Sequence, residues 1–332
     1  MKHDLVHGGA LDVMRAAFPD APEPWIDLST GINPWPYPDT AISADALTHL
    51  PTRTAYETCK CAMASAIGAS PALLLLAPGS ELLIRLLPDV IRPKRVAILS
   101  PTYGDHAFVW KQAGVDIIET ADPLSLAKSV DAVVVTHPNN PDGRIFTHEA
   151  LETARQTLAA RGGWLIIDEA YADLIPEQSF APRGGADGLI ILRSFGKFFG
   201  LAGVRLGALL APIHIRNAMA ERLGVWPVSG PALEIGARAY DDLAWQARAR
   251  TDLAAAAARL DATLTAAGLR IVGGTSLYRF VEVDTAYGLF EQLARAGISV
   301  RRFDWSQHHL RIGLPASQDA EARLKSALTF SG

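Results

Sequence analysis

The sequence predicts an α/β protein in which a mostly parallel sheet lies between helices. Short apolar runs in the middle of the chain carry this prediction: RVAIL (95–99), DAVVV (131–135), GWLIID (163–168), LIILRS (189–194) and LGALLA (206–211). Continuous apolar runs of this length are typical of strands that are buried on both faces. Helical patterns alternate with these runs, which is the order expected of a layered α/β architecture.

Two helical patterns show the spacing clearly. Thr147 is a candidate N-cap for a helix whose Leu151, Ala154 and Leu158 share one face. A longer pattern covers residues 241–267, and Gly268 is a plausible C-terminal stop for it.

Length and composition bound the class of protein. The 332 residues suggest about two domains at roughly 150 residues each. A net charge of −4 argues against a dedicated nucleic-acid-binding protein, which usually has a concentrated basic face. No apolar run approaches the roughly 20 residues of a membrane-spanning helix, and the N-terminus lacks the apolar core of a signal peptide. We therefore expect a cytoplasmic protein.

Cysteine and histidine usage predicts neither a disulfide scaffold nor a metal site. Cys59 and Cys61 are too close together to staple a domain, and no further cysteine could complete a zinc site with them. We expect them to be buried or half-buried thiols on a helix. The histidines are scattered, and adjacent His308 and His309 on a strand would face opposite ways.

Polar residues follow three of the apolar runs. Asn139 and Asn140 come after DAVVV, Asp168 and Tyr171 after GWLII, and the third run leads to Ser194, Lys197 and Arg205. Ligands of open α/β sheets bind beyond the carboxyl ends of the strands. An amide, a carboxylate, a phenol, an amine and a guanidinium are thus predicted to gather at one edge.

The segment Ser194–Gly207 matches the pattern S-x-x-K-x-F-G-L-x-G-x-R-L-G throughout. In this segment, and in the order of the other landmarks, the chain resembles the pyridoxal-phosphate enzymes of the aspartate aminotransferase fold (fold type I, class I/II). The resemblance implies a large cofactor-binding domain with a mostly parallel sheet, and a smaller α+β domain. We expect an N-terminal arm at 1–40 that contributes to the small domain and the active site, the large domain at 41–215 and the small domain at 216–332.

The resemblance also implies a role for each landmark. Lys197 would bind the cofactor aldehyde covalently and then act as a mobile acid–base. Asp168 would keep the pyridine nitrogen protonated, so that the ring can accept electrons. The remaining expected contacts are Asn140 and Tyr171 to the phenolic oxygen, Tyr103 stacked on the ring, and Gly79, Ser80, Glu81, Ser194 and Arg205 around the phosphate. Tyr56 resembles the tyrosine that reaches the phosphate of the neighbouring subunit, which implies a homodimer.

The substrate side of the site is expected in the C-terminal third and at the N-terminus. Arg301 and Arg311 suit a substrate with two anionic groups, since guanidinium binds carboxylate and phosphate bidentately. Arg302 is the better candidate for a solvated face. HGGA (7–10) and DLSTGINPWPYP (27–38) resemble the threonine-phosphate decarboxylases of cobalamin biosynthesis.

That resemblance implies that Gly8 and Gly9 close over the substrate phosphate and that Asn33, with Asn140, contacts the substrate. Backbone N–H groups of a glycine pair can approach an anion closely because no Cβ obstructs them. Three segments depart from this family: Ala10 stands where Asn is frequent, LPTRTAY (50–56) where a Y-P-D stretch is usual, and Glu81-Leu82 where Thr-Glu is common.

The expected reaction is the decarboxylation of O-phospho-L-threonine to aminopropanol phosphate, with anchoring of the distal phosphate selecting the bond that breaks. An aminotransferase acting on histidinol phosphate or a related amino-acid-like phosphate is the alternative, because the same scaffold would serve. A cofactor-binding subunit without activity is a third reading. An intact Lys197, Asp168 and Arg205 would be odd in such a protein.

Overall fold

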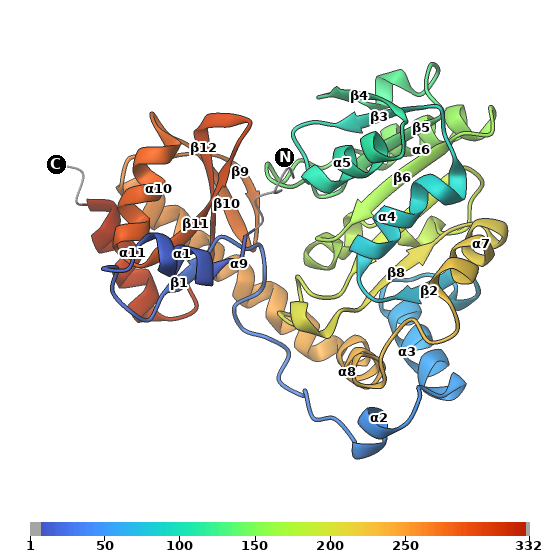
Figure 1. Ribbon diagram of the computed structural model, residues 1–332, viewed down its shortest axis with the longest axis horizontal. Helices are drawn as coiled ribbons and strands as arrows, with labels where there is room; N and C mark the ends of the chain where they lie inside the picture. Colours follow the sequence, from blue (N-terminus) through green and yellow to red (C-terminus); the bar gives the residue numbers. More distant parts are fainter. Residues whose placement is uncertain (1–7, 330–332) are drawn as a thin grey trace. The chain divides into compact units, whose positions relative to one another are not determined.

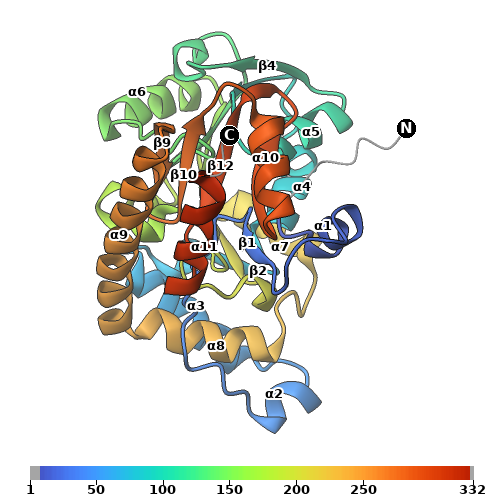
Figure 2. The same ribbon diagram turned by 90° about the vertical axis from the view of Figure 1, so that its left-hand side faces the viewer.

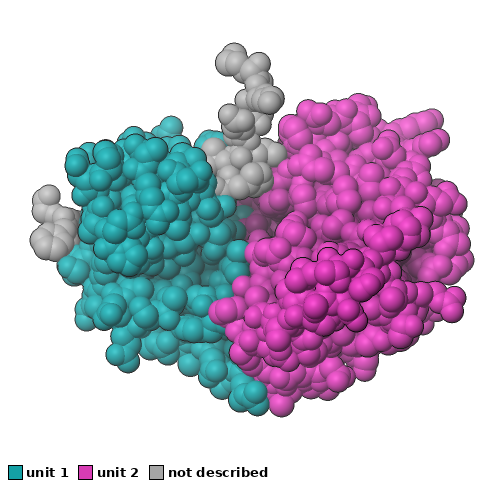
Figure 3. Space-filling model, turned by 60° about the horizontal axis from the view of Figure 1, so that its bottom comes forward, with its two compact units in different colours: residues 1–35, 141–143, 247–332 teal, residues 36–140, 144–246 magenta. Residues whose placement is uncertain are grey.

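The computed structural model describes residues 8–329, so His7 and the rest of the predicted arm before Gly8 lie outside the described residues. The chain divides into two compact units, coloured separately in Figure 3. Unit 1 holds the chain up to Trp35, Pro141–Gly143 and the chain from Ala247 onward. Unit 2 holds Pro36–Asn140 and Arg144–Gln246.

Unit 2 is built on a seven-stranded sheet (Figure 1). In spatial order its strands are β2 (Leu74–Ala77), β8 (Gly207–Leu210), β7 (Leu189–Ser194), β6 (Trp164–Glu169), β5 (Ala132–Thr136), β3 (Arg95–Leu99) and β4 (Asp116–Thr120). Strand β8 is antiparallel to both of its neighbours, and the other pairs are parallel. The five predicted strands and the mostly parallel sheet are confirmed, with boundaries shifted by one residue at most.

Helices cover both faces of this sheet, which explains its continuous apolar runs. The helices of unit 2 are α2 (Ala44–Thr48), α3 (Arg53–Ala66), α4 (Ser80–Ile91), α5 (Gly104–Gln112), α6 (His148–Ala159), α7 (Ile213–Leu223) and α8 (Gly230–Asp241). Apolar side chains of α4, α5 and α7 share one core with the sheet. On α6, the predicted cap is confirmed, because the Thr147 side chain accepts a hydrogen bond from the Ala150 N–H at 3.2 Å. The predicted Leu151, Ala154 and Leu158 are its buried residues.

Unit 1 contains a five-stranded sheet with α10 and α11 in front of it in Figure 2. In spatial order its strands are β1 (Ile26–Leu28), β11 (Ile298–Phe303), β12 (Ser306–Gly313), β10 (Tyr278–Glu282) and β9 (Arg270–Thr275). Its helices are α1 (Leu11–Ala17), α10 (Ala286–Arg295) and α11 (Gln318–Thr329). Strand β1 is parallel to β11, so the N-terminal segment completes a sheet made by the C-terminal third.

The long predicted helix is α9 (Leu243–Ala266), which runs along the chain from unit 2 into unit 1. It is followed by Gly268 at φ 77°, a left-handed conformation that suits glycine after a helix. By compactness, α7 and α8 belong to unit 2, where α8 packs on α3. The sequence analysis placed the start of the small domain at residue 216, which would assign α8 to the small domain. The domain borders stay a prediction.

Three further observations concern the cysteines, the length of the helices and the candidate metal ligands. Cys59 is buried on α3 as expected, but Cys61 is exposed because it points to the outer side of the same helix. No helix within residues 8–329 is long and apolar enough to cross a membrane. Over the same residues, no group of three or more His, Cys, Asp or Glu side chains is placed to hold a metal ion.

Candidate active site

The predicted cofactor residues of unit 2 gather at one edge of its sheet. Strands β5, β6 and β7 are adjacent and parallel, so their carboxyl ends lie at the same edge. Asp168 is the fifth residue of β6, Ser194 ends β7, and Asn140 follows β5 by four residues. The topology therefore brings together side chains that are far apart in the sequence.

The Asp168 carboxylate is buried and fixed at both oxygens. His106 Nε2 lies 3.0 Å from Asp168 Oδ2, and the Ala170 N–H donates to Oδ1 at 3.1 Å. Both the histidine and the aspartate are buried. An acid held in this way presents one orientation at the sheet edge, as a partner for a protonated ring nitrogen requires.

Asn139 holds the loop that follows β5. The Asn139 amide donates to the Pro101 carbonyl at 3.0 Å and accepts from the Thr102 hydroxyl at 2.8 Å. Asn139 is fully buried, whereas Asn140 is partly exposed. The neighbouring strand end supplies Tyr171, which is buried and stands directly before a short 3₁₀ turn (Ala172–Leu174).

Lys197 lies in a tight loop that stacked aromatic rings anchor. Phe195 and Phe199 stack with centroids 4.5 Å apart, and Phe199 also stacks on Trp245 at 5.7 Å. Phe195, Phe198 and Phe199 are completely buried, while Lys197 is half-buried. Among residues 8–329, the Lys197 amine makes no hydrogen bond or ion pair. The loop thus holds the lysine backbone rigidly and leaves its amine available for a covalent partner.

The start of α4 and Arg205 form a cradle for an anion. Helix α4 begins after Gly79 (φ 85°) without any side-chain cap, so its first N–H groups are available. A Cβ on Gly79 would lie 2.7 Å from Arg205 Nη2, so only glycine allows the guanidinium this close. Gly207 is the partner of Ser194 across β7 and β8. A Cβ on Gly207 would lie 2.7 Å from the Ser80 nitrogen, so glycine is needed there as well. The predicted phosphate contacts thereby lie together.

Tyr103 stands at the start of α5, and its hydroxyl donates to Glu81 Oε2 at 3.0 Å. Burial, with the nearby carboxylates of Glu81 and Asp105, raises the pKa of Tyr103 well above its ordinary value. The phenol therefore stays neutral and keeps its proton for this hydrogen bond.

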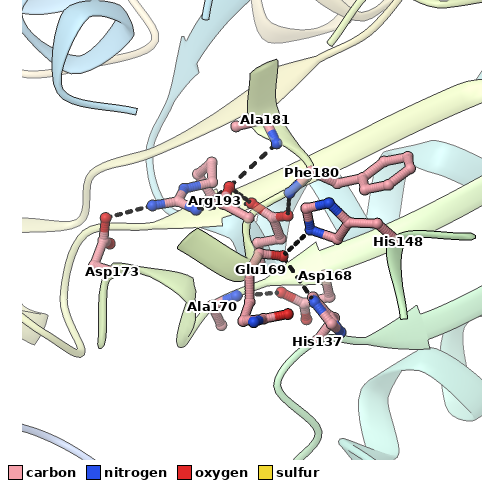
Figure 4. Close-up of polar contacts among 11 residues, drawn as sticks. His137, His148, Asp168, Glu169, Ala170, Asp173, Phe180, Ala181 and Arg193 are labelled. Atoms are coloured by element: carbon pink, nitrogen blue, oxygen red, sulfur yellow. Dashed lines mark hydrogen bonds and ion pairs between the residues drawn. The ribbon is translucent and has the colours of Figure 1, made fainter. Parts of the chain in front are cut away.

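A buried charge network stiffens the same sheet edge from its other face (Figure 4). Arg193 pairs with Glu169 at 2.8 Å and also with Asp173, and all three side chains are buried. Glu169 is the partner of Arg193 across β6 and β7. Since side chains alternate along a strand, these two lie on the face opposite to Asp168 and Ser194.

We predict that Arg193→Met lowers the free energy of unfolding by about 3–5 kcal/mol, because two carboxylates would stay buried without their cation. Arg95→Met is the matched control: Arg95 pairs with Asp116 at 2.6 Å, but both side chains are about half exposed. The control should cost less than about 1 kcal/mol. Urea unfolding of both variants checks this, and equal losses would contradict it.

Tyr56 is bonded within its own chain. Its hydroxyl oxygen accepts a hydrogen bond from the Leu76 N–H at 2.9 Å, on strand β2. Burial raises the pKa of Tyr56 to about 12. This contact gives the Tyr56 hydroxyl a hydrogen-bond partner within its own chain. The role of Tyr56 toward a neighbouring subunit stays a prediction.

In unit 1, the two candidate substrate arginines are direct cross-strand partners. Arg301 on β11 is paired with Arg311 on β12, so both side chains leave the same face of the sheet. Arg311 is buried, with its guanidinium 4.9 Å from the centre of the Tyr278 ring. Two like charges placed directly opposite one another across two strands destabilise a sheet. Arg302 leaves the other face and lies over Tyr287 and Phe290 of α10.

The glycine arm is tied to the same arginine through Ser29. The Gly9 N–H donates to Ser29 Oγ at 2.8 Å, and Arg311 donates to the Ser29 carbonyl at 2.7 Å. A Cβ on Gly8 would lie 2.5 Å from that carbonyl, so the arm needs glycine there. Asn33, which follows Ser29 by four residues, is buried. Its side-chain oxygen accepts a hydrogen bond from the Trp35 N–H at 2.9 Å.

Sequence reasoning missed three contributors: His106, Ser29 and Arg85, which pairs with Glu81. Two of them had a local signal, since His106 lies one helical turn after Tyr103 and Arg85 lies one turn after Glu81. The role of Ser29 depends on contacts between segments that the sequence pattern does not show.

Pyridoxal phosphate fits the residues of unit 2. The uncapped start of α4 with Arg205 suits its phosphate, the fixed Asp168 carboxylate suits a protonated pyridine nitrogen, and the Lys197 amine suits its aldehyde. The donor set thus covers the three functional groups by which this cofactor is held.

Comparisons with known proteins agree with this picture. A threonine-phosphate decarboxylase from Pseudomonas aeruginosa is 41% identical over 327 residues, 98% of this chain and 97% of that protein. A second one, from a Sinorhizobium species, is 40% identical over 337 residues, 99% of this chain and 98% of that protein. The crystal structure of histidinol-phosphate aminotransferase from Sinorhizobium meliloti in complex with pyridoxal-5'-phosphate matches with a TM-score of 0.80 at 17% identity, covering 98% of this chain and 94% of that one.

The structural match confirms the predicted fold type, a large α/β unit with a mostly parallel sheet and a smaller unit with a mixed sheet. The family model described as aminotransferase class I and II matches residues 23–325, nearly the whole chain. The chain therefore belongs to the aminotransferase class I and II family.

Proposed function

We propose that this protein is a pyridoxal-phosphate-dependent threonine-phosphate decarboxylase, which converts O-phospho-L-threonine to aminopropanol phosphate and carbon dioxide in cobalamin biosynthesis. The observation that carries the proposal is identity of 40–41% with two threonine-phosphate decarboxylases over at least 97% of either chain. The fold is shared with a histidinol-phosphate aminotransferase, so fold alone does not select the reaction.

The residues of unit 2 hold the cofactor in this proposal. Arg205, Ser194 and the N–H groups at the start of α4 bind its phosphate, and the Tyr103 ring stacks on its pyridine ring. Asp168 keeps the ring nitrogen protonated, Asn140 and Tyr171 donate to its phenolic oxygen, and Lys197 anchors it covalently. When bound, the cofactor supplies an electron sink for the electrons of a bond broken at the substrate Cα.

The residues of unit 1 orient the substrate. Arg301 and Arg311 leave one sheet face together and suit two anionic groups, the carboxylate and the phosphate of O-phospho-L-threonine. Gly8 and Gly9, fixed at Ser29, would add backbone N–H groups for the phosphate. Holding both anions sets which bond at Cα is aligned for cleavage. After carbon dioxide leaves, the Lys197 amine donates the proton that Cα requires.

Product analysis tests the proposal. The purified protein is incubated with pyridoxal phosphate and O-phospho-L-threonine in the absence of any keto acid, and the products are identified by mass spectrometry. We expect aminopropanol phosphate. Unchanged substrate, together with amino transfer from histidinol phosphate once 2-oxoglutarate is added, would favour the aminotransferase instead.

A homodimer and a cytoplasmic location are part of the same proposal. They are supported by resemblance to the family, in which Tyr56 corresponds to the tyrosine that reaches the neighbouring subunit. Sedimentation of the purified protein would test the dimer, and a monomer that decarboxylates at full rate would contradict it.

The cradle at Gly79 gives a direct prediction. We expect Gly79→Ala to weaken pyridoxal-phosphate binding by about tenfold or more, because its Cβ would displace the Arg205 guanidinium and remove a charge-assisted contact. Gly114→Ala is the matched control: Gly114 also has a positive φ, 73° against 85°, but a Cβ there meets nothing within 4 Å. Titration with the cofactor, followed by its absorption, measures both. Equal weakening in the two variants would assign the effect to backbone strain alone.

A further inference from the structure

The loop after β5 contains a short segment, Pro141–Gly143, that belongs to unit 1, although the chain on both sides of it belongs to unit 2. Within unit 1 this segment contacts β9, the edge strand of the five-stranded sheet. The Gly274 N–H donates to the Asp142 carbonyl at 2.9 Å, so the segment adds one backbone hydrogen bond to the outer side of β9. We call Pro141–Gly143 the docked loop.

Two glycines allow the docked loop to approach β9 this closely. A Cβ on Gly143 would lie 1.8 Å from the Gly274 carbonyl oxygen, and a Cβ on Gly273 would lie 2.1 Å from the Asp142 carbonyl oxygen. Both neighbours are backbone atoms, which cannot move aside as a side chain can. Gly143 has a φ of 72°, whereas Gly273 has no positive φ. An alanine at either position would therefore push the docked loop away from β9, and at Gly273 without backbone strain.

The docked loop lies at the end of a cross-strand row that includes both candidate substrate arginines. Phe280 on β10 is the partner of both Gly273 on β9 and Arg311 on β12. Arg311 is in turn the partner of Arg301 on β11. Directly paired residues point to the same face of a sheet, so a Cβ on Gly273 would point to the face that the two arginines leave. The Asp142 carbonyl occupies that place, and the docked loop therefore lies on the arginine face.

Ring contacts agree with this assignment of the face. The Phe280 ring stacks on His309 with centroids 4.7 Å apart, and His309 precedes Arg311 by two residues on β12. The Arg311 guanidinium lies 4.9 Å from the centre of the Tyr278 ring, and Tyr278 precedes Phe280 by two residues on β10. Because Tyr278 and Phe280 are buried, the strands between the arginines and the docked loop form a closely packed link.

Asn140 is the residue that this link concerns. A peptide bond joins it to Pro141, which sets the two Cα atoms about 3.8 Å apart. On the unit 2 side, the Asn139 N–H donates to the Arg144 carbonyl at 2.9 Å and closes the base of the loop. The Asn140 backbone is thus held by a hydrogen bond within unit 2 and, through Pro141, by the dock on the sheet of unit 1.

We infer that Gly143 and Gly273 are positioning residues, which dock Pro141–Gly143 on β9 and thereby set the Asn140 amide for a substrate held by the arginines of the same sheet. The inference rests on the proposed function, in which Asn140 contacts the substrate, and deepens it. One sheet then carries both the arginines that bind the anionic groups and the anchor of Asn140. A fixed distance between these contacts lets them form together on one substrate molecule.

The kinetic test measures kcat/KM for O-phospho-L-threonine in the full chain with pyridoxal phosphate. We expect Gly273→Ala and Gly143→Ala each to lower kcat/KM about tenfold, because a hydrogen bond to a charged substrate group is weakened. Asn140→Ala should lower it at least as much. In the double variant N140A/G273A, kcat/KM should lie within about twofold of that of N140A alone, since the glycine acts through Asn140.

Hydrogen exchange of the Gly274 amide gives a second readout, which does not depend on turnover. Its bond to the Asp142 carbonyl protects this amide, so it should exchange about tenfold faster or more in G143A and G273A. Coupling between two equilibria is reciprocal. If loss of the dock weakens substrate binding about tenfold, saturating substrate must slow Gly274 exchange by about the same factor.

The effect of substrate on exchange is measured in Lys197→Ala loaded with pyridoxal phosphate, because the expected slow turnover of that variant leaves the substrate intact. Both glycines are unaltered in this protein. The measurement therefore decides the matter even where a glycine variant does not fold.

Gly268→Ala is the matched control for Gly143→Ala. Both glycines belong to unit 1 and have similar φ values, 77° and 72°, but a Cβ on Gly268 meets nothing within 4 Å. G268A thus has the backbone strain without the collision. Its kcat/KM and its Gly274 exchange should stay within about twofold of those of the unaltered chain.

Three results would overturn the inference alone, in a chain that decarboxylates O-phospho-L-threonine. The first is faster Gly274 exchange in G273A with unchanged kcat/KM, which would mean that the dock opens without effect on the substrate. The second is a tenfold effect of G273A that persists beside N140A, which would mean that the glycine does not act through Asn140. The third is Gly274 exchange that saturating substrate leaves unchanged. An unaltered chain that does not decarboxylate O-phospho-L-threonine would instead overturn the proposed function, and this inference with it.

Discussion

Replacing Lys197 by alanine is expected to reduce the rate of decarboxylation by about 10⁴-fold or more. The side chain has two roles in this account, covalent anchoring of the cofactor and proton delivery to Cα, and a positioned acid–base alone contributes about 10²–10⁴-fold. The fold should survive the change, because Phe195, Phe198 and Phe199 hold the loop while the lysine amine makes no hydrogen bond or ion pair with residues 8–329.

Two measurements check this expectation. Turnover of O-phospho-L-threonine gives the rate, and borohydride reduction before denaturation shows whether the cofactor is attached covalently. The unaltered chain should keep the cofactor through denaturation, and Lys197→Ala should lose it. Lys111→Ala is the control, since Lys111 is an exposed lysine paired with Glu119 at 2.8 Å. Covalent retention by Lys197→Ala would place the anchor on another lysine.

Replacing Asp168 by asparagine is expected to lower kcat by about 10²–10³-fold, the effect of removing one fixed electrostatic partner from a reacting centre. Asparagine has nearly the same shape, and its amide can still contact His106, but it carries no charge to keep the ring nitrogen protonated. The change therefore separates the charge of this residue from its packing.

Asp131→Asn provides the comparison for that variant. Asp131 lies just before the amino end of β5 and accepts hydrogen bonds from the N–H groups of Lys94 and Arg95 at 2.8 and 3.0 Å. Its replacement should leave kcat within about twofold. Steady-state kinetics and thermal unfolding of both variants decide the matter. A kcat for Asp168→Asn close to that of the unaltered protein would show that the Asp168 charge is not needed to keep the ring nitrogen protonated.

The sequence was sufficient for features that depend on local pattern. Buried strands such as β7 appear as unbroken apolar runs, and the Thr147 cap and α9 follow helical spacing. The segment Ser194–Gly207 placed Lys197 and Arg205, because the spacing of the loop and its glycines is set within one stretch of chain. These features need no knowledge of distant contacts.

Features that depend on tertiary contacts could not be predicted in the same way. The pairing of His106 with Asp168 joins residues 62 positions apart, and the cross-strand pairing of Arg301 with Arg311 depends on the register of one hairpin. The Tyr56 hydroxyl binds the backbone N–H of Leu76 on β2, and the sequence pattern does not show this contact. Cys61 is exposed because α3 buries only one of its faces, and the Cys-x-Cys spacing does not place both thiols on that face.

The central claim is the choice of the bond that breaks, and the fate of the substrate carboxyl carbon tests it most directly. Carboxyl-labelled O-phospho-L-threonine is incubated with the holoenzyme in the absence of a keto acid, and labelled carbon dioxide is trapped and compared with aminopropanol phosphate. We predict equal amounts of the two products. Label retained in the substrate would contradict the claim. Label retained in a keto acid formed once an amino acceptor is added would identify the protein as an aminotransferase.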